Sequence, residues 1–394
     1  MTFINRSCHI LILVTAFLAG PLWGQPGKTA ELNDFRVPDI ALHERIVDAE
    51  LTLEAFGQRF VIELVPNDVL WSRLPANRRD HMLDQGHNAF YRGGLAGNQA
   101  SWARINRIGG VLTGMFSDGE QLYMIDKAQG FSLPAGRAVP PDATIIFRLN
   151  DVTADWRFDA GGAEHHHHEH HGSGPAARSV PDKTSVQRGT QFADYMVPVT
   201  IVSDTEFQDE HGSDTDAVVV GRMNLIDGFY SGQVGTGILL WHHEILDDNG
   251  SLASPELSDF REFMSSGDGS GIPFEGQAHL FTGREIEGAA GWAYIDVTCN
   301  TTSGVGVNED LWNDTISALL VAHELGHNFG AGHDDDPDSC PEDTPEGIMN
   351  SMISQNNDEF SQCSLDAMIP NLTGASCLQP NAGILFQDRF QSPN

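Results

Sequence analysis

Basic residues are scarce in this chain of 394 residues: 22 lysines and arginines stand against 55 aspartates and glutamates, a net charge of −33. Proteins that bind nucleic acid need a positively charged surface to meet the phosphates, so the deficit argues against that class. It also argues against electrostatic docking on anionic membranes. Apolar residues make up 40% of the chain, enough for a packed core, and we expect a folded, soluble protein.

Long apolar runs are also missing. The run from Ile10 to Leu18 is too short to span a bilayer, which takes about 20 residues. It follows Arg6 and precedes Ala19, the pattern of a secretory signal peptide over residues 1–24; an uncleaved anchor is the alternative. We therefore expect a secreted protein, extracellular or periplasmic, with no membrane span in its mature form.

Cysteine is rare as well, and no C-x-x-C spacing occurs. Cys8 leaves with the predicted signal peptide, and the other four cysteines lie beyond residue 298. In an exported protein, four cysteines indicate two disulfides, with three possible pairings. A structural zinc site made from all four is the alternative, without spacing to support it. The four are Cys299, Cys340, Cys363 and Cys377.

The patterning of the chain changes between residues 158 and 192. Residues 25–158 are predicted to form a β-rich domain, and residues 159–191 a glycine-rich, polar and cleavable linker. Residues 192–380 alternate strands and helices, and residues 381–394 form a tail whose role is not indicated. The expected strands are two around Gly57, a hairpin over 109–125, and 144–149, 197–203, 237–241 and 291–298; the expected helices are 216–230, 257–264 and a third that begins at an N-cap, Asn308.

The strongest chemical signal is the run H-E-L-G-H-N-F-G-A-G-H from His323 to His333. Residues four apart lie on one helical face, so His323 and His327 can bind one metal ion. Gly330 permits the left-handed backbone that ends a helix, which lets the chain return His333 as a third ligand. Three imidazoles leave the fourth position of a tetrahedral zinc open for water, as in catalytic sites.

Glu324 follows the first predicted ligand and can reach that water. A carboxylate in this place acts as general base and later as the acid that protonates the leaving amine. The bare motif arises by chance about once per hundred chains of this length, and the full spacing on the order of once in 10⁵. The sequence therefore predicts a zinc-dependent metalloendopeptidase with one catalytic Zn²⁺.

The run is the long metzincin signature, and Ile348-Met349-Asn350 is the predicted Met-turn, with Met352 as a weaker candidate. Within the metzincins, the chain resembles the adamalysin/reprolysin family from about residue 50 to 380. The resemblance is carried by Asp334 directly after the third histidine, by F-S-x-C-S at 360–364, by G-x-A-Y at 291–294 with Cys299 and G-V-x-V at 304–307, by the strand at 195–204, and by prodomain-like residues at 91–93, 101–102 and 114–125.

The resemblance implies an α/β (α+β) metzincin domain with a mixed, mostly parallel sheet and a long active-site helix that ends near Gly330. It implies a β-rich prodomain before it, and hence a zymogen. It implies that an extended protein or peptide substrate binds along an edge strand that includes Gly291, Trp292 and Ala293. It also implies disulfides Cys299–Cys377 and Cys340–Cys363, and we expect a monomer.

The chain departs from the family at two sites. No cysteine lies between Cys8 and Cys299, so a prodomain thiol cannot bind the zinc. The family's calcium site is not matched either, because Val197, Gly276 and Pro380 stand where its ligands would be. We therefore do not predict that calcium site.

The histidine run from 165 to 171 within the linker leaves two hypotheses for latency. In one, an imidazole from the run occupies the open zinc position. In the other, the folded prodomain covers the cleft and the run is a solvated, low-complexity linker. Two rival functions also stay open: a metal-binding or adhesive exported protein, and a zinc hydrolase of a non-protein amide such as peptidoglycan.

Overall fold

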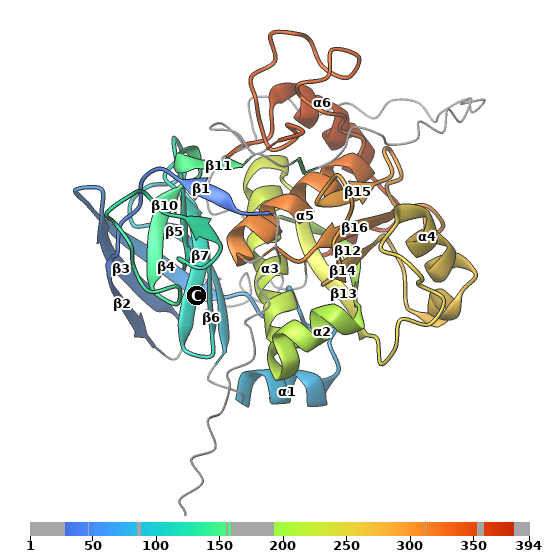
Figure 1. Ribbon diagram of the computed structural model, residues 1–394, viewed down its shortest axis with the longest axis horizontal. Coiled ribbons are helices and arrows are strands. Elements are labelled where there is room, and N and C mark those ends of the chain that lie inside the picture. The colour runs from blue at the N-terminus through green and yellow to red at the C-terminus, as the bar shows by residue number, and fades with distance from the viewer. Residues whose placement is uncertain are drawn as a thin grey trace, which may run out of the picture.

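The computed structural model describes residues 28–381, apart from residues 46, 85–87, 155–156, 159–192, 312 and 353–357. The predicted signal peptide, the histidine run and nearly all of the predicted tail lie outside the described residues. Two units are present, an N-terminal unit over residues 28–158 and a C-terminal unit over residues 193–381 (Figure 1).

The N-terminal unit is built on an eight-stranded sheet in which every neighbouring pair is antiparallel. The two strands expected around Gly57 are β3 (Ala49–Ala55) and β4 (Gln58–Pro66), and the expected hairpin is β7 (Val111–Ser117) and β8 (Leu122–Lys127). The strands of this sheet, in spatial order, are β10 (Thr144–Arg148), β8 (Leu122–Lys127), β7 (Val111–Ser117), β6 (Trp102–Ile108), β5 (Ala89–Leu95), β4 (Gln58–Pro66), β3 (Ala49–Ala55) and β2 (Asp39–Glu44).

A second, three-stranded sheet and a helix complete this unit. Strand β1 (Ala30–Leu32) lies between β11 (Val152–Ala154) and β9 (Phe131–Ser132), so the start and the end of the unit are neighbours. Helix α1 (Ala76–Asp84) lies in the connection between β4 and β5, and a short 3₁₀ turn, η1 (Leu149–Asp151), precedes β11.

The C-terminal unit has a mixed sheet. Strand β12 (Tyr195–Ser203) is parallel to both β13 (Gly237–Ile245) and β14 (Gln277–Thr282), β16 (Val305–Glu309) is parallel to β14, and β15 (Gly291–Ala293) is the antiparallel edge strand. A two-residue strand, β17 (Gln379–Pro380), pairs with the start of β12. The helices are α2 (Thr205–His211), η2 (Gly212–Asp214), α3 (Thr215–Phe229), η3 (Tyr230–Val234), α4 (Leu257–Ser265), η4 (Asp268–Gly271), α5 (Asp314–Asn328) and α6 (Gln362–Leu372).

The predicted start of the third helix is wrong. Asn308 belongs to β16, where its side-chain amide donates to the Leu280 carbonyl oxygen at 3.2 Å. Helix α5 starts at Asp314, and its N-cap is Asn313, whose side chain accepts from the backbone N–H of Ile316. The alternating run before Asn313 favours a strand, and pairing with β14 places it in the sheet.

The strand expected over 291–298 is shorter than predicted. Strand β15 ends at Ala293, because Asp296 and Cys299 both have a φ of 59° and leave the extended conformation. The backbone N–H of Asp296 then donates to the His327 carbonyl oxygen at 3.0 Å. This loop therefore runs back toward the end of α5 instead of extending the sheet.

Helix α3 lies between the two units. It packs on β5 and β6 of the N-terminal sheet and on β13 and α5 of the C-terminal unit (Figure 1). All of its residues except Asp216 are buried, and one hydrophobic cluster contains side chains from both units. The close approach requires Gly228, since a Cβ there would lie 2.5 Å from the Trp102 ring. The two units therefore share one core.

Buried polar contacts also join the units. Arg104 of β6 bonds the Asp227 carboxylate of α3 at 2.7 Å, with both side chains less than a tenth exposed. Arg78 of α1 donates to Asp216 at 3.0 Å, and Asp216 in turn bonds the buried His243 ring at 2.8 Å. These contacts lower the pKa of Asp216 to about 2 in spite of its burial. Losing one partner of such a buried pair is strongly destabilising.

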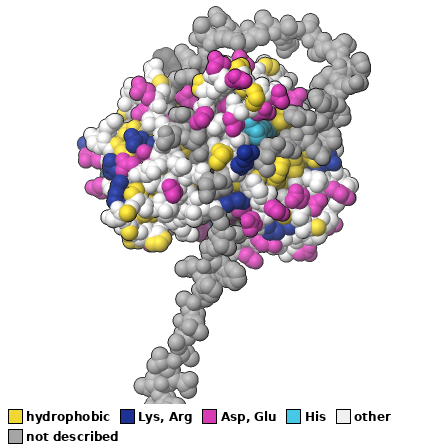
Figure 2. Space-filling view, turned by 45° about the horizontal axis from the view of Figure 1, so that its top comes forward, with side chains coloured by type: hydrophobic (Ala, Val, Ile, Leu, Met, Phe, Trp, Pro, Cys, Tyr) yellow, Lys and Arg dark blue, Asp and Glu magenta, His cyan; other side chains and the backbone are white. Residues whose placement is uncertain are grey.

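The C-terminal unit contains both disulfides that the resemblance implies. Cys299–Cys377 joins the loop after β15 to the segment after α6, and Cys340–Cys363 joins the loop after His333 to α6. Acidic side chains are spread over the face shown in Figure 2, whereas lysine and arginine form only small groups there. Among the described residues, no helix combines the length and the apolar composition that a membrane crossing requires.

Candidate metal centre

Helix α5 presents two histidines from its last turns. His323 and His327 are four residues apart and fully buried, and their Nε2 atoms are 3.1 Å from each other. Zinc–nitrogen bonds of about 2.0–2.1 Å in a tetrahedron place two ligand nitrogens about 3.3 Å apart. The spacing of the two rings is therefore close to that of a shared zinc ion.

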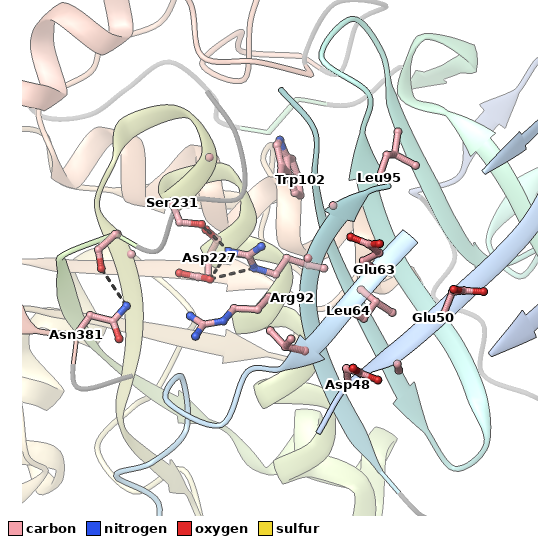
Figure 3. Close-up of a pocket in the computed structure, with 18 of the residues that line it drawn as sticks. Asp48, Glu50, Glu63, Leu64, Arg92, Leu95, Trp102, Asp227, Ser231 and Asn381 are labelled. Atoms are coloured by element: carbon pink, nitrogen blue, oxygen red, sulfur yellow. Dashed lines mark hydrogen bonds and ion pairs between the residues drawn. The ribbon is translucent and has the colours of Figure 1, made fainter. Parts of the chain in front are cut away.

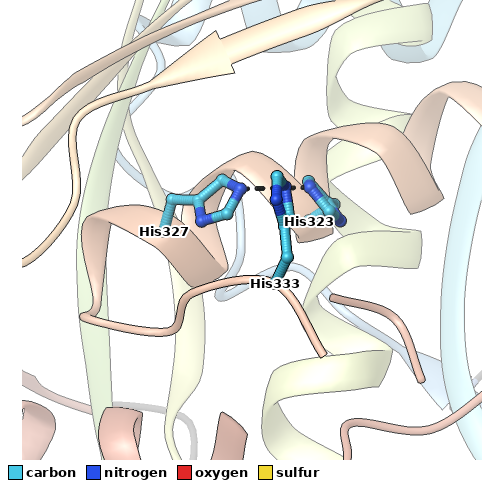
Figure 4. A group of neighbouring side chains, drawn as sticks. All are labelled: His323, His327 and His333. Atoms are coloured by element: carbon cyan, nitrogen blue, oxygen red, sulfur yellow. Dashed lines mark hydrogen bonds between the residues drawn. The ribbon is translucent and has the colours of Figure 1, made fainter. Parts of the chain in front are cut away.

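The helix ends as the sequence predicts, near Gly330. This residue has a φ of 105°, and a Cβ there would lie 2.3 Å from the side-chain nitrogen of Asn371. Only glycine fits this turn, for its conformation and for its space. The turn returns His333 toward α5, and one possible ligand atom from each of the three histidines lies within 4.8 Å of the others (Figure 4).

Backbone carbonyl groups set the tautomers of the two helical histidines. Nδ1 of His323 bonds the Ile348 oxygen at 2.7 Å, and Nδ1 of His327 bonds the Ala331 oxygen at 2.8 Å. Because a carbonyl oxygen only accepts, each Nδ1 carries the proton and each Nε2 carries a lone pair. Two lone pairs that face each other at 3.1 Å are the donor set of a cation site, so the residues fit zinc.

Met349 packs directly beneath this centre. It is fully buried, and a Cβ on Gly326, between the two helical histidines, would lie 2.4 Å from its sulfur atom. The backbone next to it holds the third histidine's loop, because the N–H of Asp334 donates to the Met349 oxygen at 3.0 Å. Met352, the weaker candidate, forms an isolated antiparallel bridge with Arg157 instead.

Glu324 is fully buried between α5 and the edge strand β15. A Cβ on Gly291 would lie 2.6 Å from a carboxylate oxygen of Glu324, so this side chain lies against the bare backbone of β15. Its charge acts on Tyr230, whose pKa is raised well above its ordinary value by burial and then by Glu324. The structure thus brings Glu324 to the predicted substrate strand.

Comparison with known proteins matches this unit to a family. Residues 195–381 match the model of the "Reprolysin (M12B) family zinc metalloprotease". The match covers just under half of the chain, and it assigns residues 195–381 to the reprolysin family.

Curated relatives extend the match beyond the reprolysin domain. "Disintegrin and metalloproteinase domain-containing protein 11" is 26% identical over 362 residues in Mus musculus and 25% in Homo sapiens, and each alignment covers 84% of this chain and 46% of the relative. "Disintegrin and metalloproteinase domain-containing protein 22" of Xenopus laevis is 24% identical over 359 residues, 84% of this chain and 37% of the relative. The chain spans less than half the length of these relatives.

One solved structure, titled "Structure of a chaperone-substrate complex", matches 38% of this chain and 28% of its own at 17% identity. Its TM-score of 0.31 carries no argument about the fold.

Asp334 of the reprolysin domain anchors the loop of the third histidine. Its buried carboxylate accepts from the Ser361 hydroxyl at 2.5 Å and from the Ser364 hydroxyl at 2.7 Å, both at the start of α6. Burial raises its pKa despite these bonds. The disulfide Cys340–Cys363 joins the same loop to the same helix. Asp334 is therefore a positioning residue for His333.

The predicted substrate strand is β15, and its edge is not empty. Gly291 and Ala293 are buried and Trp292 is half-buried. The N–H of Gly291 donates to the Phe158 carbonyl oxygen at 2.9 Å, so the end of the N-terminal unit contacts this strand. Sequence reasoning missed Phe158, because a single aromatic residue next to a polar linker has no periodicity.

A separate cavity of about 420 Å³ lies between the N-terminal sheet and α3 (Figure 3). It is lined by charged groups of both units, and the metal centre is not part of it. Among them are Glu63, Arg92, Arg104 and Asp227. Burial lowers the pKa of Arg92 to about 10. This cavity belongs to the contact between the units.

Proposed function

We propose that this protein is a secreted, zinc-dependent metalloendopeptidase that is made as a zymogen. The observation that carries the proposal is the convergence of His323, His327 and His333 beside Glu324 and the edge strand β15. Among the described residues, these three histidines form the one cluster of three or more histidine, cysteine or acidic side chains that could hold a metal ion. The family match supports the same chemistry.

In this mechanism a zinc ion would be held by Nε2 of His323, by Nε2 of His327 and by His333 as third ligand. A bound zinc ion lowers the pKa of a water and polarises the scissile carbonyl group. Glu324 takes the proton of the attacking water and later donates it to the leaving amine. Met349 is the Met-turn residue, which packs beneath the ligands without binding the metal.

A protein or peptide substrate binds extended along β15, with Gly291, Trp292 and Ala293 providing backbone contacts. Gly291 also leaves room for the Glu324 carboxylate, so catalytic base and substrate strand are adjacent. A peptide bond on β15 is therefore held close to the Glu324 carboxylate and to the three histidines, and such proximity of the reacting groups lowers the barrier to reaction. The enzyme acts as a monomer.

The N-terminal unit is the prodomain, over residues 25–158. Latency without a prodomain thiol comes from cover of the cleft or from the histidine run at 165–171, which lies outside the described residues. The shared core and the contact of Phe158 with β15 support cover. Cleavage near Arg178, Lys183 or Arg188 in the linker, 159–191, starts activation.

Casein zymography of the linker-cleaved protein tests the proposal. A cleared band that disappears with a zinc chelator and returns with added Zn²⁺ is the expected result. A protein that binds zinc stoichiometrically and clears neither casein nor a short quenched peptide is instead the metal-binding rival. Clearing of a peptidoglycan gel without clearing of casein would identify the non-protein amide hydrolase.

A further inference from the structure

Two residues at the end of the N-terminal unit, Arg157 and Phe158, lie between strand β15 and residues 351–352. The carbonyl oxygen of Phe158 accepts from the N–H of Ala290 and from the N–H of Gly291, each at 2.9 Å. On the other side, the N–H of Phe158 donates to the Ser351 oxygen at 3.0 Å, and Arg157 forms an antiparallel bridge with Met352. The chain thus passes between β15 and the segment that follows Met349.

The Phe158 side chain packs against one histidine of the metal centre, His323. It is fully buried, and its ring centroid is 5.4 Å from that of His323. The backbone that binds Phe158 also adjoins the catalytic machinery, because Gly291 lies against the Glu324 carboxylate. A residue held by backbone bonds on both sides and by a buried side chain beside a metal ligand is bound as an extended peptide would be.

We propose that Arg157 and Phe158 are an internal pseudosubstrate, which occupies the substrate cleft and keeps the uncleaved chain inactive without a thiol. This inference rests on the proposed function and specifies how the site is regulated. It also specifies a substrate class: the subsite beside His323 accepts an aromatic or other large apolar side chain, since Phe158 fills it.

Tethering explains why so short a contact is sufficient. A segment joined covalently to its site competes at an effective concentration in the millimolar range. This is well above the concentration at which most peptide substrates are present. The N-terminal side of this segment is also fixed, because β11 ends three residues before Arg157 and pairs with β1. Lys28, just before β1, bonds the Ala289 oxygen at 2.8 Å, next to the residues that bind Phe158.

The test uses the intact, zinc-loaded chain and its Phe158→Ala and Phe158→Leu variants. Phe147→Ala is the matched control, since Phe147 is equally buried but lies in β10, among core side chains of the N-terminal unit. The first readout is turnover of a short quenched peptide with a central phenylalanine. The second is fluorescence anisotropy of a labelled peptide with the sequence of residues 153–160, measured in Glu324→Ala protein, where hydrolysis does not interfere.

For Phe158→Ala we expect at least a tenfold rise in turnover without chain cleavage, and at least tenfold tighter peptide binding. Phe158→Leu should give a smaller rise in both peptide turnover and peptide binding. If Phe158→Ala shows no cooperative thermal transition and is therefore not folded, the result for Phe158→Leu is used instead. The control should leave both readouts at the parent level. Unchanged readouts in the Phe158 variants, or equal increases in Phe147→Ala, would overturn the proposal.

The two readouts separate this inference from the proposed function. Tighter peptide binding in the Phe158 variants, with no hydrolysis by any form of the protein, supports the pseudosubstrate and contradicts the endopeptidase. Hydrolysis by the linker-cleaved chain, with no effect of Phe158 on either readout, supports the endopeptidase and contradicts the pseudosubstrate.

Discussion

The carboxylate of Asp126, in β8 of the N-terminal unit, accepts a hydrogen bond from the backbone N–H of Thr315 at 2.9 Å. Thr315 is in the first turn of α5, whose backbone N–H groups have no partner within the helix, so a side chain of one unit caps the active-site helix of the other. Asp126 is almost fully buried, and burial together with the nearby Asp314 carboxylate raises its pKa to about 7.

This pKa predicts a pH-dependent stability. Folded Asp126 binds a proton more tightly than the unfolded chain, whose value is 3.8, so the group's contribution to stability is lost as pH rises toward about 7. Over pH 5 to 7 we expect the free energy of unfolding to fall by about 2 kcal/mol from this group. Asp126→Asn should flatten that slope in thermal melts of the intact chain; a slope equal to the parent's would contradict the assignment.

A second prediction concerns the catalytic base. Glu324→Ala should lower peptide hydrolysis by at least a thousandfold, while bound zinc stays near one ion per chain, because the carboxylate acts on water and not as a ligand. Zinc content by atomic absorption and turnover of a quenched peptide check both parts. Activity within tenfold of the parent, at unchanged zinc content, would refute the mechanism.

A third prediction concerns Gly291. Its missing side chain makes room for Glu324, so Gly291→Ala must push the carboxylate aside. We expect kcat to fall by about tenfold or more with zinc retained, since small displacements of a catalytic group are costly. The matched control is Gly271→Ala, because a Cβ there meets no atom within 4 Å. Similar losses in both variants would show a general effect of the added methyl group.

A fourth prediction concerns the disulfide Cys340–Cys363, which closes a loop between residues 23 apart in sequence. The Cys340→Ser, Cys363→Ser double variant should lose about 3 kcal/mol of stability by the chain-entropy estimate. It should also bind zinc more weakly, because the bond holds the loop after His333 against α6. Denaturant melts and competition with a zinc indicator measure the two effects. Weaker folding with unchanged zinc affinity would show that Asp334 alone positions the loop.

The sequence by itself determined the zinc-ligand candidates, their base and several strands of each unit. His323 and His327 need only a helix to share a face, and Gly330 needs only its own backbone freedom to turn the chain. The hairpin over 109–125 likewise follows from local alternation and a turn. These features depend on neighbours within a few residues, where spacing translates directly into geometry.

Only the tertiary structure decided what contacts that site. The start of α5 at Asp314 instead of Asn308, and the early end of β15, follow from sheet pairing and loop closure over long sequence distances. The positions of Phe158 beside His323 and of Asp126 on Thr315 depend on a core shared by two units. No local period encodes such contacts, because they join residues more than 150 positions apart.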